Sequence, residues 1–218
     1  LGSNYINLTP TLIPNLNNII AISTSEYHSL FLTASTTVYA CGLNNYGQLG
    51  NNTTTDSNIP VLSSAWLVTA ICAGNGFSLF LTTAKTVYGC GNNEDGQLGI
   101  GSYNDRKIPT KVANLDSVIN IANSYSGSIF LKNDGTVWCS GHNYHGDLAN
   151  YGGNNVPEQI TALTNISSIS TGNSLVDYNH IGYYSSSFFT KTDGTILASG
   201  FNWRGQLGIG QKDNEFKF

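Results

Sequence analysis

The sequence predicts a single all-β repeat protein over residues 1–218, and three observations lead to that fold class. A thirteen-residue stretch occurs four times, and its first glycines, Gly42, Gly91, Gly141 and Gly200, are 49, 50 and 59 residues apart. Intervals of this size are typical of propellers and solenoids. Short runs rich in β-branched and aromatic residues fill the space between the copies. No segment has a convincing helical period.

Each repeat is expected to hold about four strands. Runs bounded by Ser, Thr, Asn and Gly give the first three strands of each unit, at 18–23, 28–33 and 38–42, at 67–73, 77–82 and 86–91, at 118–122, 128–132 and 136–140, and from 166–171 onward. A short run near 59–61, 108–112 or 156–160 closes a unit. The repeats are placed at about 10–59, 60–108, 109–156 and 157–218, with 1–9 as the tail of a preceding repeat.

Tight hairpin turns are predicted between the second and third strands of the units. The turns at 133–135 and 192–194 read Asn-Asp-Gly and Thr-Asp-Gly, in which Gly supplies a positive φ. In the first two units the same turn, at 34–37 and 83–86, has no Gly and is a weaker version.

The repeated motif has five defining positions, each with a structural interpretation. The first Gly ends a strand where the backbone turns or approaches a neighbour, and the Asn can bond backbone groups within the turn. The second Gly permits a left-handed residue, the Gln or Asp can tie the loop to an adjoining strand, and the Leu fills the interface between units. Because the motif recurs in every unit, a structural role is favoured over a catalytic or phosphate-binding role. The motif residues are Gly42, Asn44, Gly47, Gln48, Leu49, Gly91, Asn93, Gly96, Gln97, Leu98, Gly141, Asn143, Gly146, Asp147, Leu148, Gly200, Asn202, Gly205, Gln206 and Leu207.

The motif has a known counterpart. The copies at 38–50 and 87–99 end in G-x-N-x-x-G-Q-L-G, and in this the chain resembles the regulator of chromosome condensation family over nearly its whole length. His28 matches the family's His before the second strand, although other residues replace it in the later copies. Trp138 matches the aromatic residue that often precedes the Gly.

The resemblance implies a β-propeller of four-stranded antiparallel blades, seven-bladed in full-length members. Seven units need roughly 350 residues, and this chain holds four motifs with partial units at both ends. We therefore expect a partial ring, which is either a fragment of a longer protein or an array that partner chains complete.

Charge and hydropathy exclude some classes of partner. Only 10% of residues are charged and the net charge is -4. The densest basic cluster, Arg106, Lys107 and Lys111, is too sparse to follow a phosphate backbone, which argues against nucleic acid. No apolar run approaches the roughly 20 residues of a membrane span.

The sequence shows no catalytic or metal-binding arrangement. The close pair His142 and His145 has Asp147 nearby, but nothing completes a triad or a ligand set, so we expect no enzyme, no metal and no cofactor. The cysteines lie in strand-like runs without Cys-x-x-Cys spacing, which favours small buried thiols and leaves disulfides as the alternative. They are Cys41, Cys72, Cys90 and Cys139.

The repeats differ most in two places, and these are the candidate partner-binding elements. Residues 174–185 include 11 extra residues relative to the second unit, and we interpret them as a loop between two strands. The other place is the variant motif loop of the third unit. The candidate residues are Asp177, Tyr178, His180, Tyr183, Tyr184, His142, Tyr144 and His145.

The favoured function is a non-enzymatic scaffold that binds a protein partner, not identified by the sequence, through its loop face. Three alternatives stay open: a surface, particle or fibre component that self-associates through open blade edges, a secreted enzyme inhibitor, and guanine-nucleotide exchange on a small GTPase. The last is implied by the family resemblance rather than by the repeats themselves, because a fold does not carry a function.

Overall fold

The computed structural model describes residues 9–143, 146, 148, 153–177 and 180–211, with the backbone alone at 173–177 and 180–184. The described part contains fifteen strands and no helix, and so no helix that could cross a membrane. In chain order the strands are β1 (Ile19–Thr24), β2 (His28–Thr33), β3 (Val38–Gly42), β4 (Ser57–Leu62), β5 (Val68–Ala73), β6 (Phe77–Thr82), β7 (Val87–Gly91), β8 (Arg106–Lys111), β9 (Val118–Asn123), β10 (Gly127–Lys132), β11 (Val137–Gly141), β12 (Asn154–Gln159), β13 (Ile166–Asp177), β14 (His180–Lys191) and β15 (Ile196–Gly200).

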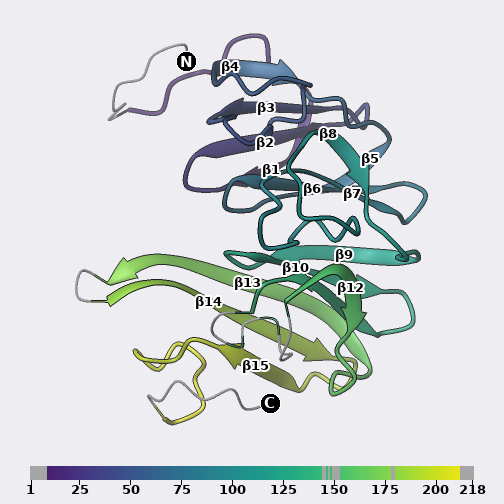
Figure 1. Ribbon diagram of the computed structural model, residues 1–218, viewed down its shortest axis with the longest axis vertical. Helices are drawn as coiled ribbons and strands as arrows, with labels where there is room; N and C mark the ends of the chain where they lie inside the picture. The colour runs from purple at the N-terminus through teal and green to yellow at the C-terminus, as the bar shows by residue number, and fades with distance from the viewer. Residues whose placement is uncertain (1–8, 144–145, 147, 149–152, 178–179, 212–218) are drawn as a thin grey trace.

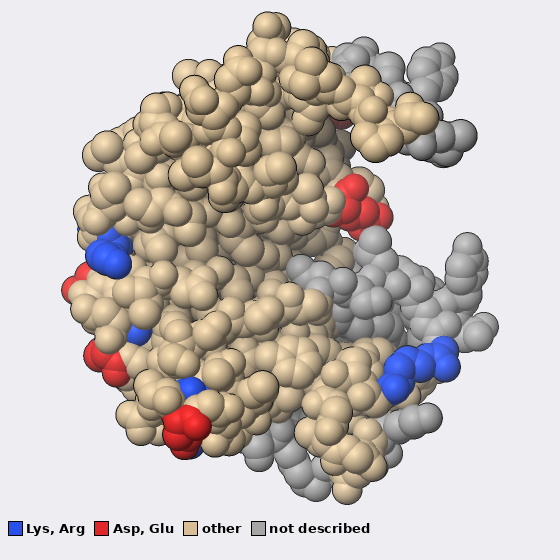
Figure 2. Space-filling model, turned by 180° about the vertical axis from the view of Figure 1, so that it is seen from behind, with Lys and Arg blue, Asp and Glu red and all other residues tan. Residues whose placement is uncertain are grey.

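The strands form four antiparallel sheets, which are propeller blades. The first three sheets have the orders β1-β2-β3-β4, β5-β6-β7-β8 and β9-β10-β11-β12, and the fourth has β13-β14-β15. Each strand pairs with its neighbours in sequence, as hairpin connections require. The prediction of an all-β propeller with four-stranded blades is confirmed. The blades follow one another along the molecule (Figure 1), and the described residues form an open arc rather than a closed ring (Figure 2).

The core lies between neighbouring blades. Leu49, from the first motif loop, belongs to a buried cluster that joins β2 and β3 to Val68, Phe80 and Cys90 of the second blade. Leu98 and Leu148 occupy the same position in the next two interfaces. The prediction that the motif Leu fills the interface between units is therefore confirmed, and the blades are held together chiefly by apolar burial.

The hairpin turns adopt the predicted backbone. Gly135 and Gly194 have φ of 78° and 86°, and Thr36 and Lys85 adopt the same conformation with φ of 64° and 61°. A left-handed conformation costs a residue with a Cβ roughly 1–2 kcal/mol. The first two turns are the weaker versions for this reason.

The segment 174–185 differs from the sequence interpretation. It is not a loop between two strands, because it continues β13 and β14 as a long hairpin whose pairing runs from Ile166↔Lys191 to Asp177↔His180. Main-chain hydrogen bonds can pair two strands whose sequence lacks a regular alternation of apolar and polar residues, so the absence of that pattern in 174–185 did not prevent pairing. The offset of 11 residues agrees with the structure, since Ser186 pairs with Gly200 as Phe77 pairs with Gly91.

Candidate interaction face

The glycines of the motif allow close contact within and between blades. Gly42 has φ 111°, and a Cβ there would collide with the carbonyl oxygen of Tyr27. Gly47 has φ 87°, and a Cβ there would lie 2.6 Å from the Cα of Lys107 in β8 of the next blade. Both positions exclude a side chain, in agreement with the sequence prediction.

The buried Asn organises the loop. The Oδ1 of Asn93 accepts a hydrogen bond from the backbone N–H of Leu98 at 2.9 Å, and its Nδ2 donates to the carbonyls of Ser102 and Asn104. The same acceptor bond occurs in every copy, to the N–H of Leu49, Leu148 and Leu207. The side-chain amide of Asn93 thus provides hydrogen-bond partners for the backbone of the turn and holds the connection that follows the turn in place.

The Gln after the second Gly acts differently from the prediction. Its side chain bonds its own loop: Gln48 Oε1 accepts the N–H of Tyr46 at 3.0 Å, and Gln97 Oε1 accepts that of Asp95 at 3.1 Å. The backbone carbonyl makes the tie to the next blade, accepting from the Ser78 hydroxyl at 2.7 Å for Gln48. Because Gly47 has no Cβ, the backbone of the loop lies close to β8 of the next blade. The backbone carbonyl of Gln48 therefore reaches the next blade without help from its side chain. Asp147, the variant at this position, lies outside the described residues.

His28 joins the same interface. Its Nε2 lies 2.9 Å from the Ser78 hydroxyl, and its Nδ1 lies 2.8 Å from the Ser25 hydroxyl. Because Ser78 donates its proton to the Gln48 carbonyl, it must accept from a protonated Nε2. The Nδ1 of the neutral ring is then an acceptor, and the Ser25 hydroxyl shares its proton between Nδ1 at 2.8 Å and the His28 carbonyl at 3.2 Å. Burial lowers the pKa of His28 from 6.5 to about 4, so the ring is neutral in the folded chain near pH 7.

Two sets of loops meet at one end of the blades. The turns after the first strands and the motif loops after the third strands lie at the same end, because both strands run in the same direction through an antiparallel sheet. We call this end the loop face. It carries a hollow of about 370 Å³ with contributions from three blades. The lining residues are Tyr27, Leu43, Asn45, Tyr46, Asn75, Asn92, Glu94, Asp95, Gln97, Tyr125 and Ser126.

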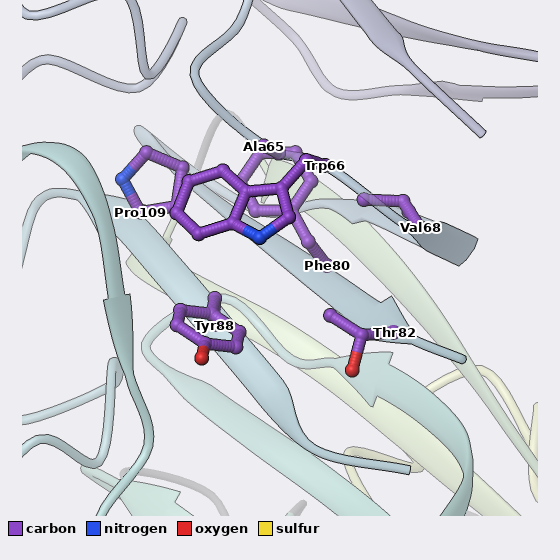
Figure 3. A pocket seen from close by; sticks show the side chains of 7 residues that line it. All are labelled: Ala65, Trp66, Val68, Phe80, Thr82, Tyr88 and Pro109. Atoms are coloured by element: carbon purple, nitrogen blue, oxygen red, sulfur yellow. The ribbon is translucent and has the colours of Figure 1, made fainter. Parts of the chain in front are cut away.

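A second pocket, shown in Figure 3, does not have the size of a ligand site. Trp66, Tyr88 and Pro109 are among the residues that line it, and the ring centroids of Trp66 and Tyr88 are 6.0 Å apart. Its volume of about 10 Å³ leaves room for at most about one water molecule. It is a packing gap between the blades and their connections.

Family models match the repeats directly. The model "Regulator of chromosome condensation (RCC1) repeat" matches residues 37–81 and 86–131, and a second model of the same description matches 19–48 and 68–97. Together they cover 19–131, slightly more than half of the chain. The chain belongs to the regulator of chromosome condensation repeat family.

Solved structures agree with this membership. The human protein WBSCR16 is similar with a TM-score of 0.76 and 24% identity over 91% of this chain and 51% of that one. Prp20p from Saccharomyces cerevisiae, in a structure described together with its binding to Gsp1p and histones, gives 0.74 and 21% over 93% of this chain and 50% of that one. Yeast RCC1 (Prp20) bound to Kap60 gives 0.73 and 20%, over 91% and 47%. The chain spans about half the length of these structures, and the likeness shows the fold.

The predicted partner-binding residues of this family member are only partly placed. The backbones of Asp177, His180, Tyr183 and Tyr184 lie in the β13–β14 hairpin, which leaves the fourth blade at the loop face. His142 follows β11 at the same end and is half-buried. Three other candidates fall outside the described residues: Tyr144, His145 and Tyr178. Among the described residues no group of three His, Cys, Asp or Glu side chains could hold a metal ion.

The hollow was not predicted from the sequence. Tyr27 and Tyr46 come from two loops of the first repeat and Tyr125 comes from the third, so all three line one hollow only once the blades are arranged. The hairpin connects to it directly, because the Ser185 hydroxyl accepts the backbone N–H of Tyr125 at 3.0 Å.

The cysteines of the chain are all free thiols, and the predicted burial holds for two of the four. Cys90 and Cys139 are buried, whereas Cys41 and Cys72 are half-buried. Burial raises the pKa of the Cys72 thiol to about 12.

Proposed function

We propose that this chain is a non-catalytic protein-binding scaffold whose partner docks on the loop face. The hollow that spans three blades carries the proposal. Its wall combines tyrosine rings, Asn amides and the carboxylates of Glu94 and Asp95. Tyrosines supply large contact area at a low cost in side-chain entropy, and amides supply hydrogen bonds, which is the composition of many protein-binding surfaces.

The β13–β14 hairpin supports the same face. Its strands are 12 residues each, against 6 for the first two strands of the other blades. The extra length leaves the blade at the end where Tyr125 lines the hollow. A partner seated in the hollow would therefore also meet the hairpin. Only 10% of the residues are charged, and charged side chains are few on the face shown in Figure 2, so contacts in the hollow are expected to depend on aromatic and amide groups.

Site-directed photocrosslinking tests the face. A photoreactive phenylalanine analogue replaces Tyr125 in the hollow, and a matched control replaces Lys85 in a turn at the opposite end of the blades. In extracts of the cells that make the protein, we expect a defined crosslinked protein from position 125 alone. Tyr46→Ala in the same chain should abolish it. Equal crosslinking at both positions, or no effect of Tyr46→Ala, would refute the proposed face.

Replacing the hairpin separates its role from that of the hollow. The segment 174–185 is exchanged for a single glycine, as Gly76 alone separates Asn75 from Phe77 in the second blade, which removes the 11 extra residues and leaves the Thr171↔Ser187 pairing of the blade available. We expect unchanged circular dichroism and loss of the crosslink at position 125. A crosslink that persists would restrict the site to the hollow.

Exchange activity on a small GTPase stays a prediction. The likeness to Prp20p, at 21% identity, concerns the fold. Release of labelled nucleotide from Gsp1p on addition of the chain would measure it directly.

A further inference from the structure

We infer that the hollow on the loop face binds an arginine side chain of the partner protein. This inference rests on the proposed function and names the chemistry by which that partner is recognised. The hollow combines three features that suit a guanidinium group. Its wall holds carboxylates that have no partner in the fold, tyrosine rings beside them, and no cationic residue among the described residues that line it.

The carboxylates of Glu94 and Asp95 are charged groups that the fold does not use. Neither accepts a hydrogen bond or forms an ion pair within the part of the chain that the structure describes. The other aspartates with described side chains all have such a role. Asp56, Asp105, Asp134 and Asp193 accept backbone N–H groups of their own loops, and Asp116 pairs with Lys132 at 3.2 Å.

Hydrogen bonds within the loop fix the backbone that carries the two carboxylates. The N–H of Glu94 donates to Asn92 Oδ1 at 2.9 Å, and the N–H of Asp95 donates to Gln97 Oε1 at 3.1 Å. The buried Gln97 also donates from Nε2 to Asn92 Oδ1 at 3.1 Å, which joins the two bonds into one network. Because this backbone is already ordered, a partner loses little conformational entropy when it engages the carboxylates.

Tyrosine rings line the same hollow as the carboxylates. The Tyr46 ring lies against the second blade, where a Cβ on Gly76 would be only 3.2 Å from its Cδ2. Tyr46 and Tyr125 are half-buried, and Tyr27 is 50% exposed. A planar guanidinium can stack on such a ring while its N–H groups donate to a carboxylate, so both kinds of group can hold the same side chain.

The charge of the wall selects a cationic partner. Arg106 and Lys107 in β8 do not line the hollow, and the Arg106 guanidinium donates to the carbonyls of Asn104 and Asp105. A partner without a cation would therefore cover two unpaired carboxylates, which costs free energy. Arginine fits better than lysine, because its rigid fork of N–H groups matches carboxylate geometry and its plane matches an aromatic ring.

An NMR titration with capped tripeptides tests this preference without knowledge of the partner. The probes are acetyl-Gly-Arg-Gly-amide and its lysine and citrulline analogues, of which citrulline keeps the shape of arginine without its charge. We expect the arginine probe to shift the amide signals of Glu94 and Asp95 with a Kd of about 1–10 mM. The citrulline probe should bind at least about 10-fold more weakly. The lysine probe should bind more weakly than the arginine probe, and added salt should weaken both charged probes.

Substitutions locate the binding of the probe. Glu94→Gln combined with Asp95→Asn should raise the Kd of the arginine probe by about 10-fold or more. The control, Asp116→Asn combined with Glu158→Gln, removes the same charge away from the loop face and should change the Kd by less than about 2-fold. Both double variants should keep the wild-type circular dichroism. Absence of saturable shifts, equal binding of the three probes, or equal effects of the two double variants would overturn the inference.

The crosslink at position 125 separates this inference from the proposed function. We expect Glu94→Gln combined with Asp95→Asn to abolish the crosslinked protein. If the crosslink forms and persists in this variant, the loop face binds a partner without an arginine in the hollow, and only the present inference fails. If the arginine probe binds as expected but no crosslinked protein forms in extracts, the proposed function fails while the preference of the hollow for arginine stands.

Discussion

The buried His28 makes the stability of the first blade interface dependent on pH. In the unfolded chain this imidazole titrates near 6.5, and in the folded chain burial lowers its pKa to about 4. Between these values the unfolded state binds more protons, so the free energy of unfolding falls as the pH falls through this window. Protonation would also use the Nδ1 lone pair that accepts the hydrogen bond from Ser25.

The size of the effect follows from the two pKa values. From pH 7 to pH 5 the contribution of His28 to the free energy of unfolding should drop by about 2 kcal/mol, and the full difference below pH 4 is about 3 kcal/mol. The pair of variants His28→Gln and His28→Phe removes this titration. Gln retains a donor and an acceptor for the two serines, and Phe is the residue that stands at the same position in the second blade, as Phe77.

Urea denaturation at pH 7 and pH 5 measures the effect. The other histidines and the carboxylates contribute equally to wild type and variants, so the difference in pH dependence isolates His28. We expect both variants to lose about 2 kcal/mol less than wild type between the two pH values, whatever their stability at pH 7. If all three chains lose the same amount, His28 is not held neutral by its burial and the assignment of its tautomer fails.

Three further predictions concern the repeat framework, each measured by urea denaturation. Asn93→Ala should lower the free energy of unfolding by about 3 kcal/mol or more, because it leaves the buried N–H of Leu98 and two carbonyls without partners; Asn45→Ala, at an exposed position of the motif loop, should cost far less. Leu98→Ala should cost about 2–5 kcal/mol through the cavity it opens between blades, and a loss below 1 kcal/mol would contradict its place in the core. Thr36→Gly should stabilise by about 0.5–1 kcal/mol and Gly135→Ala should destabilise by about 1–2 kcal/mol, since both turns need a positive φ; opposite signs would contradict the turn assignment.

Local pattern was sufficient to predict the blades. The runs at 28–33 and 77–82 coincide with β2 and β6, because turn residues and β-branched runs are properties of neighbouring residues. The register of β13 and β14 beyond Thr171 was not predictable in this way. The sequence of 174–185, S-L-V-D-Y-N-H-I-G-Y-Y-S, has no regular alternation of apolar and polar residues, so the pattern alone did not distinguish a hairpin from a loop.

Atomic roles within the motif were harder to predict than the motif itself. The sequence shows that a Gln follows the second Gly, but a Gln offers a side-chain amide and a backbone carbonyl, and nothing in the pattern says which one reaches the next blade. The answer depends on the backbone approach at Gly47. The hollow was missed for a related reason, because its tyrosines are far apart in sequence and converge through blade geometry.

Within the motif, some positions build the repeated framework and others form the variable wall of the hollow. In G-x-N-x-x-G the Gly and Asn positions are fixed by backbone contacts and buried hydrogen bonds, whereas the two positions between Asn and Gly, Asn45–Tyr46 and Glu94–Asp95, line the hollow. The third repeat carries Tyr144 and His145 at these same positions. A motif that builds the propeller identically in each blade can thus present a different pair of side chains from each blade. Exchanging Asn45–Tyr46 with Glu94–Asp95 would keep the framework and the composition of the hollow while moving its charge to another blade. If the partner binds the loop face in a fixed orientation, this exchange should weaken binding without changing the free energy of unfolding by more than about 0.5 kcal/mol.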